Sequence, residues 1–215
     1  MSVQDAIVYV IDDDPAMLDS LSWVIESFGI KVKTYICAQD FIDNYNADQH
    51  SCILLDVRMK GISGPELQLR LNELGTHTPP IIFISGYEDI PLVVRIMQAG
   101  AIDFLTKPFN NQILLETINK ALRIDKTNRE KILSNLKAQE KFSSLSTREM
   151  QILKGICAGK RNKIISNELS ISLKTVEAHR AAVMKKLKVK SVSELIKMSM
   201  THSMENEPIE LPAKI

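Results

Sequence analysis

The sequence contains few cysteines and no long apolar segment. Its three cysteines, Cys37, Cys52 and Cys157, stand in unrelated contexts without CxxC spacing, which indicates reduced thiols rather than a disulfide framework or a zinc site. No apolar run approaches the roughly 18 to 20 residues that cross a bilayer. The N-terminus also has no basic stretch followed by an apolar one, as a signal segment would. We therefore expect a cytoplasmic protein that does not contact a membrane.

The composition is that of an ordinary globular protein, with 45% hydrophobic and 25% charged residues. A chain of 215 residues can form two modest domains or one large domain. The net charge of +1 hides a split between the two halves, because residues 1–121 carry 8 basic and 16 acidic side chains and residues 122–215 carry 19 and 10. An acidic half joined to a basic half predicts two tasks, with the basic half facing a polyanion.

Short apolar runs alternate with helical patterns over the first 120 residues or so. The expected strands are residues 7–11, 31–36, 52–55, 81–84 and 101–105. This alternation predicts an α/β fold with a doubly wound, parallel, five-stranded sheet, and the more polar second strand and the short fifth strand favour the flavodoxin-like order 2-1-3-4-5. In the helix after the first strand, Trp23 and Phe28 are expected to pack against the core.

Acidic residues follow two strands that this order places side by side. Asp12 and Asp13 follow the first strand, and Asp56 follows the third. Three neighbouring carboxylates repel one another unless a cation lies among them, and hard oxygen ligands with open positions suit Mg²⁺. Ser85 and Lys107 follow the fourth and fifth strands at the same edge, where a hydroxyl and an ammonium group could hold phosphoryl oxygens.

These residues agree in type, order and strand placement with a known family: residues 3–122 resemble the receiver domain of bacterial two-component response regulators. The resemblance implies that a sensor histidine kinase phosphorylates Asp56. It also implies that Asp13, Asp56 and the backbone carbonyl of Arg58 bind Mg²⁺ directly, while Asp12 acts through water. The protein would then not be an enzyme in the usual sense, but a phosphoacceptor that takes part in its own phosphotransfer and dephosphorylation.

The same resemblance gives roles to the far side of the pocket. Ser85 and Lys107 would contact the phosphoryl oxygens, and the Lys107–Pro108 peptide bond is expected to be cis. Phe104 occupies the position of the aromatic switch residue, which is expected to turn inward when Ser85 moves toward the phosphate. An ordinary core role for Phe104 is the alternative.

Residues 111–141 contain neither Gly nor Pro and are rich in helix formers. They predict that the last receiver helix continues as a linker. Apolar residues recur with 3-4 spacing at Leu115, Ile118, Leu122, Ile132 and Leu136. Asp125 and Arg129 interrupt this pattern, so a coiled-coil linker and a solvated spacer helix both remain open.

The basic C-terminal region predicts four short helices between residues 143 and 202. Ser146 and Glu149 have the spacing of a capping box, as have Ser191 and Glu194. A tight turn at residues 170–172 separates the second helix from the third, as in a helix-turn-helix. Residues 143–202 carry 12 basic and 4 acidic side chains, which suits contact with nucleic acid.

This region resembles the LuxR-type DNA-binding domain in its FixJ-like branch, through the stretches LSTREMQIL and KIISNELSISLKTVEAHRAAVMKKL. The resemblance implies that the third helix enters the major groove of promoter DNA with Val176 among its leading residues. Contacts to phosphates are expected mainly from Lys174, Thr175, His179 and Arg180. Contacts to base edges are expected from Glu177, Ala178 and Ala181, and Lys185 and Lys186 would add attraction that is independent of sequence.

The two resemblances together predict a transcription regulator that forms a homodimer and binds DNA when Asp56 is phosphorylated, with RNA polymerase as a further partner. The expected domains are residues 1–122 for the receiver, 123–142 for a helical linker, 143–202 for DNA binding and 203–215 for a disordered tail. One alternative is a DNA-binding regulator whose receiver only dimerises, independently of phosphate. Another is a Mg²⁺-dependent phosphohydrolase, which Arg58 disfavours because such enzymes usually carry a second acid there.

Overall fold

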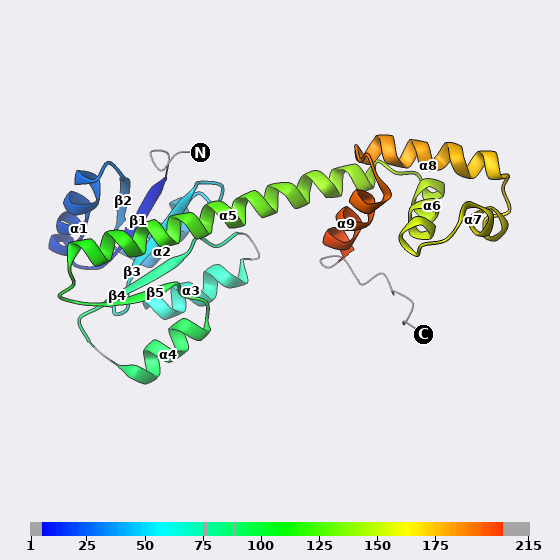
Figure 1. Cartoon of the computed structure of the whole chain (residues 1–215). Coiled ribbons are helices and arrows are strands. Elements are labelled where there is room, and N and C mark those ends of the chain that lie inside the picture. The colour runs from blue at the N-terminus through cyan, green and yellow to red at the C-terminus, as the bar shows by residue number, and fades with distance from the viewer. Residues whose placement is uncertain (1–5, 75–76, 88, 204–215) are drawn as a thin grey trace. The chain divides into compact units, whose positions relative to one another are not determined.

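The computed structural model describes residues 6–74, 77–87 and 89–203, and the chain divides into two compact units after Glu130 (Figure 1). Of the expected tail, residues 203–215, only Ser203 is described, and it ends the last helix; the rest lies outside the described residues. In the first unit the strands are β1 (Ile7–Ile11), β2 (Lys31–Tyr35), β3 (Ser51–Asp56), β4 (Ile81–Ser85) and β5 (Asp103–Thr106). They form one parallel sheet in the order β2-β1-β3-β4-β5, which confirms the predicted fold class.

The register of the sheet brings the carboxyl ends of its strands to one edge. Ile11 pairs with Leu55, and Ser85 pairs with Thr106. The backbone bonds continue one step further, because Lys107 N donates to Ser85 O at 2.7 Å. Residues directly after the strands therefore lie along a single rim, as open α/β sheets require of a binding site.

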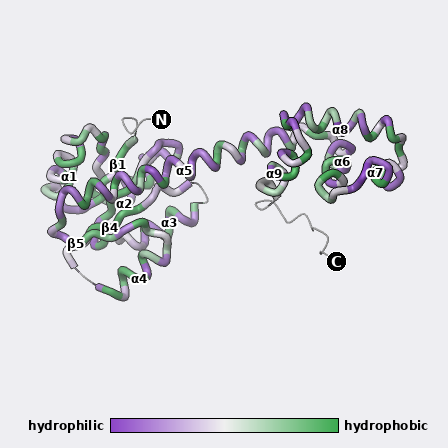
Figure 2. Tube along the Cα trace, viewed as in Figure 1, coloured by the Kyte–Doolittle hydropathy of each residue, from purple (hydrophilic) through white to green (hydrophobic). Residues whose placement is uncertain are grey.

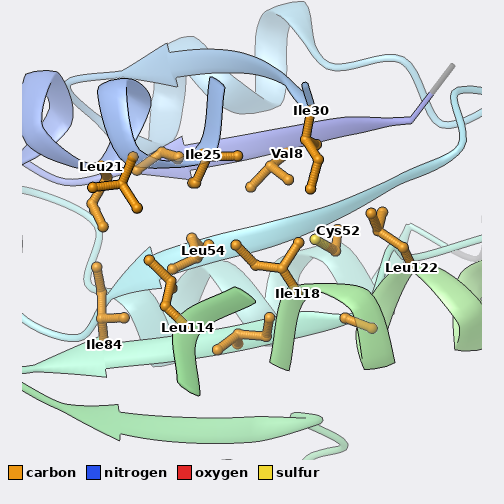
Figure 3. Packing of buried hydrophobic residues seen from close by; sticks show 14 of the residues in the cluster. Val8, Leu21, Ile25, Ile30, Cys52, Leu54, Ile84, Leu114, Ile118 and Leu122 are labelled. Atoms are coloured by element: carbon orange, nitrogen blue, oxygen red, sulfur yellow. The ribbon is translucent and has the colours of Figure 1, made fainter. Parts of the chain in front are cut away.

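Helices cover both faces of the sheet. They are α1 (Pro15–Ser27), α2 (Ala38–Asn44), α3 (Gly64–Glu73), α4 (Ile90–Gln98) and α5 (Asn111–Ser143). Residues of α1 and α5, including Leu21, Ile25 and Ile118, pack on one face of the sheet (Figure 3). Residues of α2, α3 and α4, including Phe41 and Leu67, pack on the other. Figure 2 shows the apolar residues gathered on the strands between these layers.

The first helix departs from the sequence interpretation in one respect. Trp23 is 74% exposed and Phe28 is 60% exposed, so the prediction that they pack against the core was wrong. The buried face of α1 is already filled by Leu18, Leu21, Val24 and Ile25. Trp23 lies outside this stripe and Phe28 is the C-terminal capping residue, so neither ring can reach the core.

The long helix α5 confirms the prediction of an extended helix across residues 111–141. Leu115, Ile118 and Leu122 are buried in the receiver core, which explains the first half of the 3-4 pattern without a coiled coil. Ile132 and Leu136 are exposed, and a coiled coil in the linker stays a prediction. The first unit continues past residue 122, the expected end of the receiver, to Glu130.

The second unit contains α6 (Thr147–Cys157), α7 (Asn162–Glu168), α8 (Leu173–Leu187) and α9 (Val192–Ser203). The capping box of Ser146 and Glu149 is formed as predicted. At the start of α9, Glu194 N donates to the Ser191 hydroxyl, and the Glu194 carboxylate accepts from Lys190 N. Within the described part of the chain, no helix is both long and apolar enough to cross a bilayer.

Candidate functional site

Two carboxylates and one ammonium group meet at the carboxyl rim of the sheet. Asp12 follows β1, Asp56 ends β3 and Lys107 follows β5. The Nζ atom of Lys107 lies 2.8 Å from Oδ2 of Asp12 and 2.7 Å from Oδ1 of Asp56. Both carboxylates are nearly inaccessible to solvent, and the Lys107–Pro108 bond is cis, as expected. The structure thus brings together three of the predicted pocket residues from three strands.

Backbone groups hold the remaining carboxylate oxygens in place. Arg58 N donates to Oδ2 of Asp56 at 2.7 Å, and Asp14 N donates to Oδ1 of Asp12 at 2.9 Å. The loop after β3 folds back against the rim at Gly64, where a Cβ atom would lie 2.3 Å from the backbone oxygen of Asp56. Only glycine allows this close approach.

The electrostatics of the pocket follow from burial and from these contacts. Burial raises the pKa of the Asp56 carboxyl group, and the hydrogen bond from Lys107 opposes this effect only in part. Burial alone would lower the pKa of Lys107, but its hydrogen bonds to Asp12 and Asp56 raise that pKa above its usual value. Lys107 is therefore held as a cation and offsets part of the negative charge.

Asp13 and Arg58 border this centre. Oδ2 of Asp13 accepts a hydrogen bond from Lys60 N at 3.2 Å, so the loop after Asp56 is tied to the end of β1. The guanidinium carbon of Arg58 lies 4.6 Å from the centre of the Tyr87 ring, a cation–π contact beside the pocket.

The two expected switch residues lie on neighbouring strands. Ser85 is buried, and its hydroxyl accepts from Tyr87 N and donates to Tyr87 O, both at 3.1 Å. Phe104 on β5 pairs in register with Phe83 on β4. It is partly buried and packs against the cluster on the face of α2, α3 and α4. The Ser85 hydroxyl thus forms hydrogen bonds within the loop that follows β4.

The donor set of the pocket fits a hard divalent cation. Asp12 and Asp56 already converge on one cationic group, and carboxylate and carbonyl oxygens are the ligands that Mg²⁺ prefers. Across residues 6–74, 77–87 and 89–203, no group of three or more His, Cys, Asp or Glu side chains is arranged to hold a metal ion. The physical reason at this rim is that Lys107 lies between the two carboxylates and Asp13 is bound to the backbone of Lys60.

The predicted recognition helix is α8, which Ser172 caps through a bond from Thr175 N. Exposed or partly exposed positions are Lys174, Thr175, Glu177, Ala178, His179, Arg180, Ala181, Lys185 and Lys186. Val176 must be corrected, because it is fully buried in the core with Val183 and Leu187 and offers no surface to DNA. Lys186 is also engaged, since its Nζ contacts Glu149 Oε2 at 2.6 Å and Ser144 O at 3.1 Å.

Sequence reasoning missed a second polar cluster in the first unit, around the buried Asp125 of α5. His50 and His77, which precede β3 and β4, both bond to its carboxylate. The available signal was the pair Asp125 and Arg129 at positions where the 3-4 pattern of α5 calls for apolar residues.

A doubly wound sheet with this acid–lysine rim, followed by a helix-turn-helix unit, defines the class of receiver proteins with a DNA-binding output. Comparison with known proteins gives the same result. Residues 8–119 match the response regulator receiver domain, and residues 143–199 match the bacterial regulatory proteins of the luxR family. The chain belongs to the two-component response regulators with a LuxR-type DNA-binding domain.

Similar proteins cover nearly the whole chain. The response regulator protein TmoT of Ectopseudomonas mendocina is 43% identical over 93% of this chain and 90% of its own length. The transcriptional regulatory protein FixJ of Bradyrhizobium diazoefficiens is 39% identical over 93% of this chain and 97% of its own. The structure of response regulator StyR has 39% identity and a TM-score of 0.83, and the match covers 91% of this chain and 98% of StyR.

Proposed function

We propose that a sensor histidine kinase phosphorylates Asp56 and that phosphorylation promotes dimerisation and sequence-specific binding to promoter DNA, by which the protein regulates transcription. The observation that carries this proposal is the convergence of Asp12, Asp56 and Lys107 on one point of the rim. A buried carboxylate with a cationic neighbour at the carboxyl edge of a parallel sheet has the chemistry of a phosphoryl acceptor.

The proposed transfer places one oxygen of Asp56 in line with the phosphoryl group. A bond forms from that oxygen to phosphorus while the bond from phosphorus to the kinase's histidine nitrogen breaks. Lys107 would turn from Asp56 to the phosphoryl oxygens, and Ser85 would move its hydroxyl from Tyr87 to the same group. Asp12, Asp13, Asp56 and the carbonyl of Arg58 would hold Mg²⁺, which would supply positive charge to the transferring group.

The movement of Ser85 on phosphorylation would alter the packing of its neighbours. Phe104 lies one strand away and would turn inward as Ser85 leaves its loop. Close by, α4 carries exposed apolar side chains at Ile90 and Val94, and Ile113 is exposed on α5. Exposed aliphatic groups of this kind suit self-association, so we assign the homodimer contact to α4, β5 and α5.

In the second unit, α8 would enter the major groove. Lys174, Thr175, His179 and Arg180 would contact mainly phosphates, and Glu177, Ala178 and Ala181 would face base edges. Lys185 would add attraction that does not depend on sequence, whereas Lys186 is engaged by Glu149. RNA polymerase would be a further partner of the DNA-bound protein.

The test compares promoter binding by the parent protein and by Asp56→Asn, with and without acetyl phosphate and Mg²⁺. We expect DNA affinity to rise only in the parent. An equal rise in both proteins would defeat the phosphorylation switch. Mass spectrometry on the treated parent tests the first alternative, because absence of an added phosphoryl group on Asp56 would favour a receiver that only dimerises. A phosphatase assay tests the second, because multiple turnovers of a small phosphate ester would favour a phosphohydrolase.

A further inference from the structure

The fully buried carboxylate of Asp125 lies at the amino ends of the strands, opposite the rim that carries Asp56. Oδ2 of Asp125 accepts hydrogen bonds from His50 Nδ1 at 2.7 Å, Ser51 N at 3.0 Å and Arg129 Nε at 2.7 Å, and Oδ1 accepts from His77 Nε2 at 2.5 Å. Burial alone would raise the pKa of Asp125, but these bonds lower it. Asp125 is therefore ionised and accepts from every neighbour, so both imidazole rings donate an N–H.

Arg129 extends the same cluster. Its Nη2 donates to the backbone oxygens of Ala47 at 2.8 Å and Gln49 at 2.5 Å. One turn of α5 is thus bound to the segment before β3 through Asp125 and Arg129, and to the segment before β4 through His77. We call Asp125, Arg129, His50 and His77 the α5 latch.

Along α5, Asp125 and Arg129 lie between the part of the helix in the core of the first unit and the part in the core of the second. The structure describes all residues from 123 to 141, and among them only Asp125 is buried. Leu122, just before, belongs to the core of the first unit, and Phe142, just after, belongs to the core of the second. Leu122 is therefore the last residue of α5 in the receiver core, and the division of the chain comes only after Glu130.

Buried ion pairs are weak evidence of stability, but displacing one partner of such a pair is costly because the other charge is left buried and unpaired. We infer that the α5 latch decides how far the receiver holds the helix that leads to the DNA-binding unit. It would thereby set the length of the tether, which we define as the part of α5 between the two units that the receiver does not hold. With the latch closed, the tether begins near Lys131. With the latch open, residues 123–130 join it.

This inference rests on the proposed function for its consequence at DNA. In a receiver dimer, each DNA-binding unit finds the second half-site at an effective concentration set by the tether. For a tether that already spans both half-sites, greater length or looseness lowers that concentration, while the affinity of one unit for one half-site stays the same. The latch would therefore act on cooperative binding and not on the phosphoryl pocket.

Hydrogen exchange on the full-length protein tests the latch without reference to DNA. Asp125→Asn replaces the acceptor, and His77→Leu removes one donor at the partly exposed edge and keeps the test valid if Asp125→Asn fails to fold. The control is Glu130→Gln, which loses the same charge from an exposed position of the same helix. We expect amides of residues 123–130 to exchange roughly tenfold faster in the latch variants, with strand amides unchanged. Unchanged exchange, or an equal increase throughout the receiver, would overturn the inference.

The DNA test uses duplexes selected from a random pool by the phosphorylated parent, with either both half-sites or one. We expect the phosphorylated latch variants to bind paired half-sites about tenfold more weakly and a single half-site almost as well as the parent. Local opening in hydrogen exchange with no change in the ratio of the two affinities would refute the tether role. If the parent itself shows no response to phosphorylation, the proposed function fails, and the exchange measurement still decides whether the latch exists.

Discussion

The Nζ atom of Lys107 lies 2.7 Å from Oδ1 of Asp56. The same ammonium group lies 2.8 Å from Oδ2 of Asp12, so one lysine balances two buried carboxylates from two other strands. The pocket is thus held together without phosphate by the group that would contact the phosphoryl oxygens. Lys107 therefore links the stability of the receiver to its chemistry.

Replacing Lys107 tests that link. Lys107→Met leaves Asp12 and Asp56 facing each other, and we expect the free energy of unfolding at neutral pH to fall by about 1–3 kcal/mol. Mg²⁺ should stabilise the variant more than the parent, because the ion replaces the missing charge. Urea unfolding with and without Mg²⁺ measures both effects. Lys120→Met is the control, since the Lys120–Asp103 pair is largely exposed and contributes little. A variant as stable as the parent would contradict the argument.

Gly64 gives a second test of the pocket. In Gly64→Ala the new methyl group would meet the backbone oxygen of Asp56 at 2.3 Å, so the loop must shift away from the acceptor. We expect a loss of stability of about 1–3 kcal/mol and slower phosphorylation of Asp56 by acetyl phosphate. Gly86→Ala is the matched control beside the same rim, because its methyl group would meet nothing within 4 Å. Equal behaviour of the two variants would show that the close approach is unimportant.

The acid sensitivity of the second unit depends on Glu149. The Lys186 ammonium group, together with the Ser146 backbone N–H, lowers the pKa of Glu149 to about 2. A lowered pKa means that its stabilising contribution is complete above the unfolded-state pKa near 4.3 and disappears as the pH falls through about 2.

We therefore expect Glu149→Gln to destabilise the second unit at neutral pH and to make its stability less dependent on pH between about 5 and 2. Hydrogen exchange of α6 and α8 amides in the full-length protein across this range is the measurement. Glu168→Gln is the control, because the Glu168 side chain is 48% exposed in its ion pair with Lys160, whereas that of Glu149 is 7% exposed. A parallel pH dependence in Glu149→Gln and the parent would refute the assignment.

Lys185 and Lys186 are neighbours with different surroundings. Lys186 is bound to Glu149 and to the Ser144 backbone, whereas Lys185 is exposed on α8. We expect Lys185→Gln to weaken DNA binding for all sequences alike and to reduce the slope of log affinity against log salt by about 0.9. Lys186→Gln should chiefly lower stability. Salt titrations of DNA binding with both variants decide this, and a larger slope change in Lys186→Gln would reverse the two roles.

The parallel sheet and its acidic rim were predictable because they depend on local sequence. Buried strands read as short apolar runs, and parallel strands bring the residues that follow them to one edge. Asp12, Asp56 and Lys107 could therefore be placed together before any coordinates. The direct ion pairs could not, because the metal expected among the carboxylates would occupy the place that Lys107 takes.

The errors concern which face of a helix is buried. Val176 was assigned to the DNA surface and is a core residue, since one turn of a short helix offers both faces and only tertiary packing decides between them. The prediction for Trp23 was wrong for the same reason, because the apolar stripe that α1 buries is already complete without its ring. Asp125 and Arg129 were recognised as interruptions of the 3-4 pattern, but the two histidine partners of Asp125 lie more than forty residues away in sequence.

Exposed Ile90 on α4 supplies the test of dimerisation. This side chain is 75% exposed, and burying an isoleucine of this kind in a dimer removes apolar surface from water. Ile90→Asp would instead place a charge in the contact. We expect it to abolish dimerisation upon phosphorylation while Asp56 is still phosphorylated and the monomer remains folded. Trp23→Asp is the matched control, because Trp23 is equally exposed on α1, outside the assigned surface. Sedimentation velocity with and without acetyl phosphate measures the dimer, and loss of the dimer in Trp23→Asp but not in Ile90→Asp would move the interface to α1.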